Sequence, residues 1–196
     1  MFNLKNLFTR ALLALMLVTG AGAASAGPTY HVTVNTGGFA GSGLIDFLLL
    51  GNDPSASTSA MLSNFSGDFG SDSFTEGDAR GSISEGVFLG THAWFNDFAQ
   101  SVNLGGRFSF DLRFDQASDS DPLTFSVGVY SDLLGTYLGD ETGTLVQIDL
   151  TPGQPDVVYT DTMLANASEV PEPATLAAMM LGLTLMGSTL RARRRK

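Results

Sequence analysis

Between residues 27 and 169, apolar side chains recur at every second position in several short segments. The clearest segment is residues 107–114, in which four large apolar side chains alternate with Arg, Ser, Asp and Arg. A period of two directs alternate side chains to opposite faces of a strand, so this pattern predicts a strand with one buried face and one wet face. Residues 30–35, 123–129 and 146–150 repeat the pattern.

Weaker strand patterns occur in five further segments, which are residues 43–50, 58–65, 79–84, 93–98 and 157–160. Clusters of Gly, Pro, Asn and Asp separate the segments and supply turns. About eight or nine short, evenly spaced strands predict one all-β domain, an antiparallel β-sandwich or jelly roll. Residues 67–81, rich in Gly, Ser and acidic side chains, are expected to form a long loop or irregular hairpin. Residues 166–173 are expected to be a polar link.

The first 26 residues have the features of a secretory signal peptide. A basic start and an apolar run at residues 11–18 precede the small residues Ala24 and Ala26. We therefore expect a signal-peptide helix over residues 1–26, with cleavage before Gly27. A buried N-terminal helix is the alternative, but the apolar run is short for that role.

A second apolar run, residues 174–190, contains no charged side chain and is expected to form a transmembrane helix. Its length is near the lower limit for crossing a bilayer. A basic tail at residues 191–196 should stay on the cytoplasmic side, which leaves the β domain at residues 27–169 outside the cytoplasm. The charged residues of this tail are Arg191, Arg193, Arg194, Arg195 and Lys196.

The segment Val170-Pro171-Glu172-Pro173 stands immediately before the second apolar run. Its two prolines oppose helix and sheet pairing, so the segment should stay extended and accessible. Pro-Glu-Pro followed by an apolar helix and an arginine-rich tail resembles the PEP-CTERM sorting signal of Gram-negative bacteria. A plain membrane anchor is the alternative, although an anchor does not need the Pro-Glu-Pro motif.

This resemblance implies that residues 170–196 are a sorting signal, with residues 171–173 as its motif. An exosortase of the inner membrane would recognise and cut it, so these residues would be recognition residues and not catalytic ones. The partners implied by the resemblance are the exosortase, the inner membrane for a time, and extracellular polysaccharide or biofilm. The N-terminal signal peptide predicts signal peptidase and the export translocon as further partners. The implied final location is the outer surface or the medium. The domain is also similar to a β-rich, uncharacterised subgroup of these proteins in residues 27–34, 95–98 and 109–112.

The expected domain is strongly acidic. It contains 19 Asp or Glu side chains, three Arg and no Lys, which is a formal charge of −16. Such a surface repels phosphate backbones, so nucleic acid is not an expected partner. Cysteine is absent from the whole chain, which excludes disulfides and thiolate metal sites.

No catalytic constellation stands out. His31 and His92 lie outside any nucleophile motif and are expected on strand surfaces. No pair of carboxylates is singled out, so we expect a protein that is not an enzyme; a secreted glycosidase is the less favoured alternative. We expect no cofactor and no dedicated metal site. Weak Ca²⁺ binding is conceivable at two acidic clusters, one of Asp115, Asp119 and Asp121 and the other of Asp68, Asp72, Glu76 and Asp78.

Trp94 is the only tryptophan and stands among other aromatic and polar residues. Aromatic rings beside Asn and Asp can stack on sugars and hydrogen-bond to them. Trp94, Asn96 and Asp97 are therefore candidate residues of a carbohydrate-binding module. Packing of Trp94 in the core is the commoner fate of such a residue and is the favoured expectation.

Overall fold

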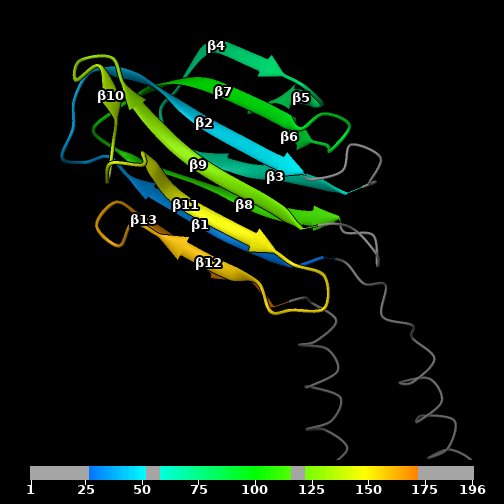
Figure 1. Ribbon diagram of the computed structural model, residues 1–196. Coiled ribbons are helices and arrows are strands. Elements are labelled where there is room, and N and C mark those ends of the chain that lie inside the picture. The colour runs from blue at the N-terminus through cyan, green and yellow to red at the C-terminus, as the bar shows by residue number, and fades with distance from the viewer. Residues whose placement is uncertain (1–26, 52–57, 116–121, 172–196) are drawn as a thin grey trace, which may run out of the picture. The chain divides into compact units, whose positions relative to one another are not determined.

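The computed structural model of the protein describes residues 27–51, 58–115 and 122–171 (Figure 1). One compact unit comprises Gly27–Val170. The expected signal peptide and the expected transmembrane helix both lie outside the described residues. Within the described part of the chain, no helix is long and apolar enough to cross a membrane.

The described residues form two antiparallel sheets, A with six strands and B with seven (Figure 1). The strands of sheet A are β1 (Thr29–Asn35), β3 (Ser59–Ser66), β5 (Ala79–Ser82), β6 (Gly86–Leu89), β8 (Arg107–Asp115) and β13 (Ala165–Glu169). Those of sheet B are β2 (Ser42–Gly51), β4 (Phe69–Glu76), β7 (Phe95–Asn103), β9 (Leu123–Ser131), β10 (Thr136–Tyr137), β11 (Thr144–Leu150) and β12 (Val157–Thr160).

Strands that are far apart in the sequence pair with one another. The order is β13-β1-β8-β3-β6-β5 in sheet A and β12-β11-β9-β2-β7-β4 in sheet B, with β10 beside β9. Thus β1 pairs with β8, β2 with β7 and β3 with β6. This nested pairing is similar to the wrapped arrangement of a jelly roll, but β4 pairs with β7 and not with β5. The expectation of an all-β fold with antiparallel sheets is confirmed.

The core lies between the apolar faces of the two sheets. Phe110 of sheet A and Phe47 of sheet B are fully buried, with ring centroids 5.1 Å apart in an edge contact. Phe65 stacks against Phe110 at 5.8 Å. Farther along the core, Phe114 of sheet A meets Phe125 of sheet B at 6.1 Å. The alternation in residues 107–114 correctly predicted a strand with one buried face, because β8 buries every second side chain.

Three sequence expectations were wrong at the level of single strands. Residues 67–81 are neither a loop nor a hairpin, because they contain β4 of sheet B and most of β5 of sheet A. The expected polar link at residues 166–173 starts as strand β13. Both β4 and β13 are edge strands on which most side chains are exposed, and only Phe69, Ala165 and Ala167 pack against the core, so the hydrophobic period is weak. The strand expected at residues 79–84 ends at Ser82, and the separate strand β6 comes after it.

Candidate functional site

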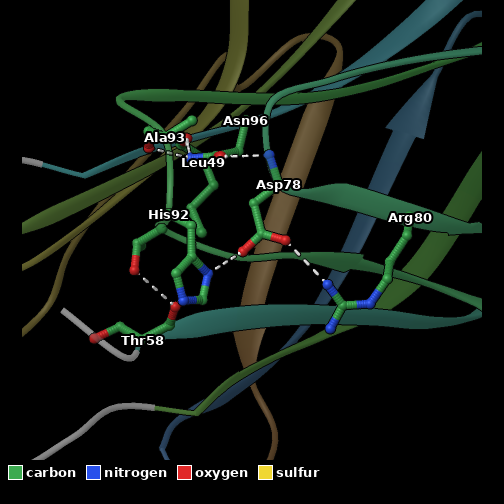
Figure 2. A network of polar contacts seen from close by, with 8 residues as sticks. Leu49, Thr58, Asp78, Arg80, His92, Ala93 and Asn96 are labelled. Carbon is green, nitrogen blue, oxygen red and sulfur yellow. Dashed lines mark hydrogen bonds and ion pairs between the residues drawn. The ribbon is translucent and has the colours of Figure 1, made fainter. Parts of the chain in front are cut away.

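Asp78, in the turn between β4 and β5, is the centre of a polar network (Figure 2). Its Oδ2 lies 2.6 Å from Nδ1 of His92, and its Oδ1 accepts a hydrogen bond from Nη1 of Arg80 at 3.0 Å. Its backbone N–H donates to Oδ1 of Asn96 at 2.8 Å. Gly90 approaches so closely that a Cβ there would lie 1.9 Å from Asp78 Oδ2. The network fastens the loop before β7 to the start of β5.

This network contains a His–Asp pair, which is part of the machinery of many hydrolases. Such a pair acts when the second ring nitrogen contacts a nucleophile. In the part of the chain that the structure describes, no hydroxyl group contacts Nε2 of His92. The guanidinium group of Arg80 also forms a cation–π contact, because it lies 3.6 Å from the centre of the Phe88 ring. The sequence predicted His92 on a strand surface. In the structure, His92 lies in the loop before β7.

The candidate sugar-binding residues Trp94, Asn96 and Asp97 do not share one surface. Trp94 is 61% exposed, so the expectation that it packs in the core is wrong. It stands in the loop before β7, where strand alternation does not apply. Asn96 is fully buried, and its Nδ2 donates to the carbonyl oxygens of Leu49 and Ala93 at 3.2 and 2.7 Å. The Asn96 amide is therefore a structural group and cannot reach a sugar.

Asp97 points away from the core and lies beside Asp46 on the outer face of sheet B. Asp46 is opposite Ala99 and Leu48 is opposite Asp97, so the two carboxyl groups are diagonal neighbours on adjacent strands. Burial, then a hydrogen bond with Asp46 and its nearby charge, raises the pKa of Asp97 to about 8. The pair therefore retains one proton at neutral pH. The Oδ1 atoms of both residues are buried and accept no hydrogen bond from the described residues.

Tyr137 of β10 covers one side of this carboxyl pair. Its ring lies over Gly128, where a Cβ would come within 3.1 Å of the ring, and Gly128 is directly opposite Asp46. Burial, followed by the charges of Asp46 and Asp97, raises the pKa of Tyr137. Sequence reasoning missed this pair. Its only local signal was an aspartate that interrupts the apolar run of residues 43–50.

The acidic clusters considered for Ca²⁺ gain no geometric support. Among the described residues, no group of three or more His, Asp or Glu side chains is arranged to hold a metal ion. Asp72 and Glu76 lie on the exposed edge strand β4, and Asp78 is committed to the network described above. Asp119 and Asp121 lie outside the described residues, so weak Ca²⁺ binding there stays a prediction.

Strand β13 brings the two ends of the domain together. It pairs with β1 in a register that places Glu169 opposite Tyr30. One residue farther, the backbone N–H of Val170 donates to the carbonyl oxygen of Thr29 at 2.8 Å. Pro171 is next in the chain and has no N–H to continue the ladder. The hydrogen-bonded domain therefore continues up to the residue before the Pro-Glu-Pro sequence.

Comparison with known protein families identifies the segment C-terminal to the domain. Residues 169–196 match the family model of the PEP-CTERM protein-sorting motif. This chain carries a PEP-CTERM sorting motif. The predicted resemblance is thereby confirmed for this segment. Two other comparisons, with curated proteins and with solved structures, gave no match.

The PEP-CTERM motif implies exosortase-dependent sorting of an exported protein, with transient membrane anchoring before surface display. The matched segment starts at Glu169, the last residue of β13, so the sorting motif adjoins the folded domain directly. Of the predicted processing residues, Val170 and Pro171 are described. The others lie outside the described residues, as do the basic tail residues and the alanines of the expected signal-peptidase site.

Gly27, the expected first residue of the mature protein, is buried against β8. A Cβ at this position would lie 2.2 Å from the carbonyl oxygen of Phe114. Only glycine fits such a close approach of two backbone segments. The chain is therefore part of the fold from the residue at which cleavage is expected.

We predict that the processed protein ends at or after Val170. Proteases generally bind the substrate as an extended, unpaired segment, and a cut before Glu169 would require β13 to separate from β1. The intact mass of the mature protein from an exosortase-positive host measures the position of the cut. A mature C-terminus within β13 would contradict this prediction.

Proposed function

We propose that this protein is a non-catalytic surface or matrix protein that an exosortase-type system processes and that associates with extracellular polysaccharide. The observation that carries the proposal is the direct junction between strand β13 and the PEP-CTERM motif. The cargo that the system delivers is then the β domain itself. Two further observations support a binding role over a catalytic one.

The first is the geometry of the carboxyl groups. Glycosidases separate their two carboxyl groups by roughly 5–9.5 Å, so that a sugar or a water molecule fits between them. The Oδ1 atoms of Asp46 and Asp97 are instead buried, so this pair does not present two open carboxyl groups to a sugar. The second is the His92–Asp78 pair, in which Asp78 also accepts a hydrogen bond from Arg80 and donates its backbone N–H to Asn96, the contacts of a structural group. A glycosidase is therefore less favoured than a carbohydrate-binding module. The exposed ring of Trp94 supports the carbohydrate-binding module, because an exposed ring can stack on a sugar.

Expression in matched hosts with and without the exosortase tests the sorting part of the proposal. With an antibody against the β domain, we expect a shortened product at the cell surface or in the medium of the exosortase-positive host. In the host without exosortase, the product should keep its C-terminal segment and stay with the inner membrane. Retention of the uncut product in both hosts would contradict the proposal.

The polysaccharide part has a separate measurement. Surface-displayed protein should be lost when extracellular polysaccharide is removed from intact cells, or should co-purify with it. A strain that makes no extracellular polysaccharide is the matched control. Equal retention of the protein by both strains would remove polysaccharide association from the proposal and leave the sorting part intact.

A further inference from the structure

The charges of the β domain are segregated between its two sheets. All three of its arginines lie on sheet A, Arg80 on β5 and both Arg107 and Arg113 on β8. The described strands of sheet B contain no Lys, Arg or His. They carry acidic residues instead, which are Asp46, Asp72, Glu76, Asp97 and Asp149. Sheet B therefore has an acidic character that no cation on its own strands offsets.

Exposed aromatic rings surround the carboxyl pair on the outer face of this sheet. Phe74 of β4 is 62% exposed and lies opposite Ala99, which is itself opposite Asp46. Directly opposed residues of antiparallel strands point to the same face, so Phe74 and Asp46 share the outer face. Phe95 and Tyr137 are also exposed on this side. We call the set Phe74, Phe95, Tyr137, Asp46 and Asp97 the aromatic-acidic face.

The spacing of the two phenylalanines indicates an elongated ligand. Phe74 is level with Ala99, and Phe95 is four residues from Ala99 along β7, so the two positions are about 13 Å apart along the strands. Asp97 lies midway between Ala99 and Phe95 on β7. A single sugar ring cannot contact both phenylalanines, whereas a chain of sugars can contact both and pass over the carboxyl pair.

Exposed aromatic clusters of this kind mark interaction surfaces. A second copy of this chain is a poor occupant, because two such acidic faces would repel each other. A polyanionic chain would be repelled for the same reason, given the formal charge of −16 on the domain. Charge complementarity requires a cationic partner, and aromatic rings attract both the apolar faces of sugars and ammonium groups.

We propose that the aromatic-acidic face binds a cationic polysaccharide, a chain of amino sugars with free amino groups. This inference rests on the proposed association with polysaccharide and names the class of polymer. Phe74 and Phe95 stack on sugar rings at two separate points of the chain. The carboxyl pair and Glu76, which is opposite Asp97, attract the ammonium groups between these points.

Titration calorimetry with the full chain, kept in a detergent without a sugar head group, tests this assignment. Short oligomers of glucosamine are the probe, and oligomers of N-acetylglucosamine and of alginate are the neutral and anionic comparisons. We expect glucosamine oligomers to bind, N-acetylated oligomers to bind about fivefold or more weakly, and alginate oligomers not to bind.

The double substitution Phe74→Ala and Phe95→Ala should weaken glucosamine binding by about tenfold, because two exposed stacking contacts are lost. Met163→Ala is the matched control, since Met163 is 86% exposed in the turn before β13, on the other sheet. If the melting temperature of the double variant falls, Phe74→Ala alone provides the measurement, because its ring is the more exposed of the two.

Two results would overturn the assignment: absence of glucosamine binding by the wild type, or equal affinity of the wild type and the folded phenylalanine variant. The second result would reduce the interaction to unspecific charge attraction. Either result leaves exosortase-dependent display unaffected, whereas failure of display with normal oligomer binding would refute the sorting proposal alone. The two proposals can therefore fail separately.

Discussion

Phe110→Ala is expected to lower the free energy of unfolding by about 3–5 kcal/mol. Phe110 is fully buried between the sheets, where it meets Phe47 in an edge contact and stacks on Phe65. Truncation removes these ring contacts and leaves a cavity that two hydrogen-bonded sheets cannot close by a small shift. Urea unfolding at one pH, monitored by circular dichroism, measures the change.

Met61→Ala is the matched control for this prediction. Met61 lies on β3, the neighbour of β8 in the same sheet, but it is 38% exposed and faces outward. Its truncation should change the free energy of unfolding by no more than about 0.5–1 kcal/mol. Similar losses in the two variants would show that the faces of the sheets do not pack as described.

The sequence predicted the strands whose two faces meet different environments. In β8, one face packs on sheet B and the other meets water, so each position of the strand carries its own polarity signal. Strands β1 and β9 also alternate between a buried face and a more exposed face. The edge strands β4 and β13 are held by backbone hydrogen bonds to their neighbours, to which side-chain polarity contributes little. Their composition therefore resembled a loop.

The functional features also differ in how far the sequence predicted them. The PEP-CTERM motif is a contiguous segment, and a local pattern was enough to identify it. The Asp46–Asp97 pair exists only because β2 lies beside β7 in one particular register, which no local pattern contains. Asn96 is an error of the opposite kind. Its position beside aromatic residues predicted a ligand site, but its side-chain amide forms hydrogen bonds with the backbone of the domain itself.

The carboxyl pair gives the domain an unusual dependence of stability on pH. Asp97 has a pKa of about 8 in the folded protein, against an ordinary value of 3.8. Between these values the folded state holds a proton that the unfolded state has lost, so this group lowers stability as the pH rises from about 4 to about 8. Above that range both states have lost the proton, and the contribution of Asp97 no longer changes.

Asp97→Asn should abolish this decline, because the asparagine amide donates a hydrogen bond to Asp46 at every pH. Near pH 5 the two proteins should have similar stability. Near pH 9 the variant should be more stable by about 1–2 kcal/mol, less than the full pKa shift would give, because water reaches this partly exposed pair and screens the repulsion. Thermal melts of both proteins at a series of pH values measure the difference.

Asp149→Asn separates this effect from a general loss of negative charge. Asp149 lies on the same outer face, where it accepts hydrogen bonds from Thr124 and Gln147 and has no carboxyl partner among the described residues. Its replacement removes one charge of the same sign, so its effect on the free energy of unfolding should stay nearly constant between pH 5 and pH 9, at roughly 1 kcal/mol or less. If the advantage of Asp97→Asn failed to grow with pH, or if Asp149→Asn showed the same growth, the two carboxyl groups of Asp46 and Asp97 would not share a proton. The acidity of sheet B would then be a property of its overall charge alone.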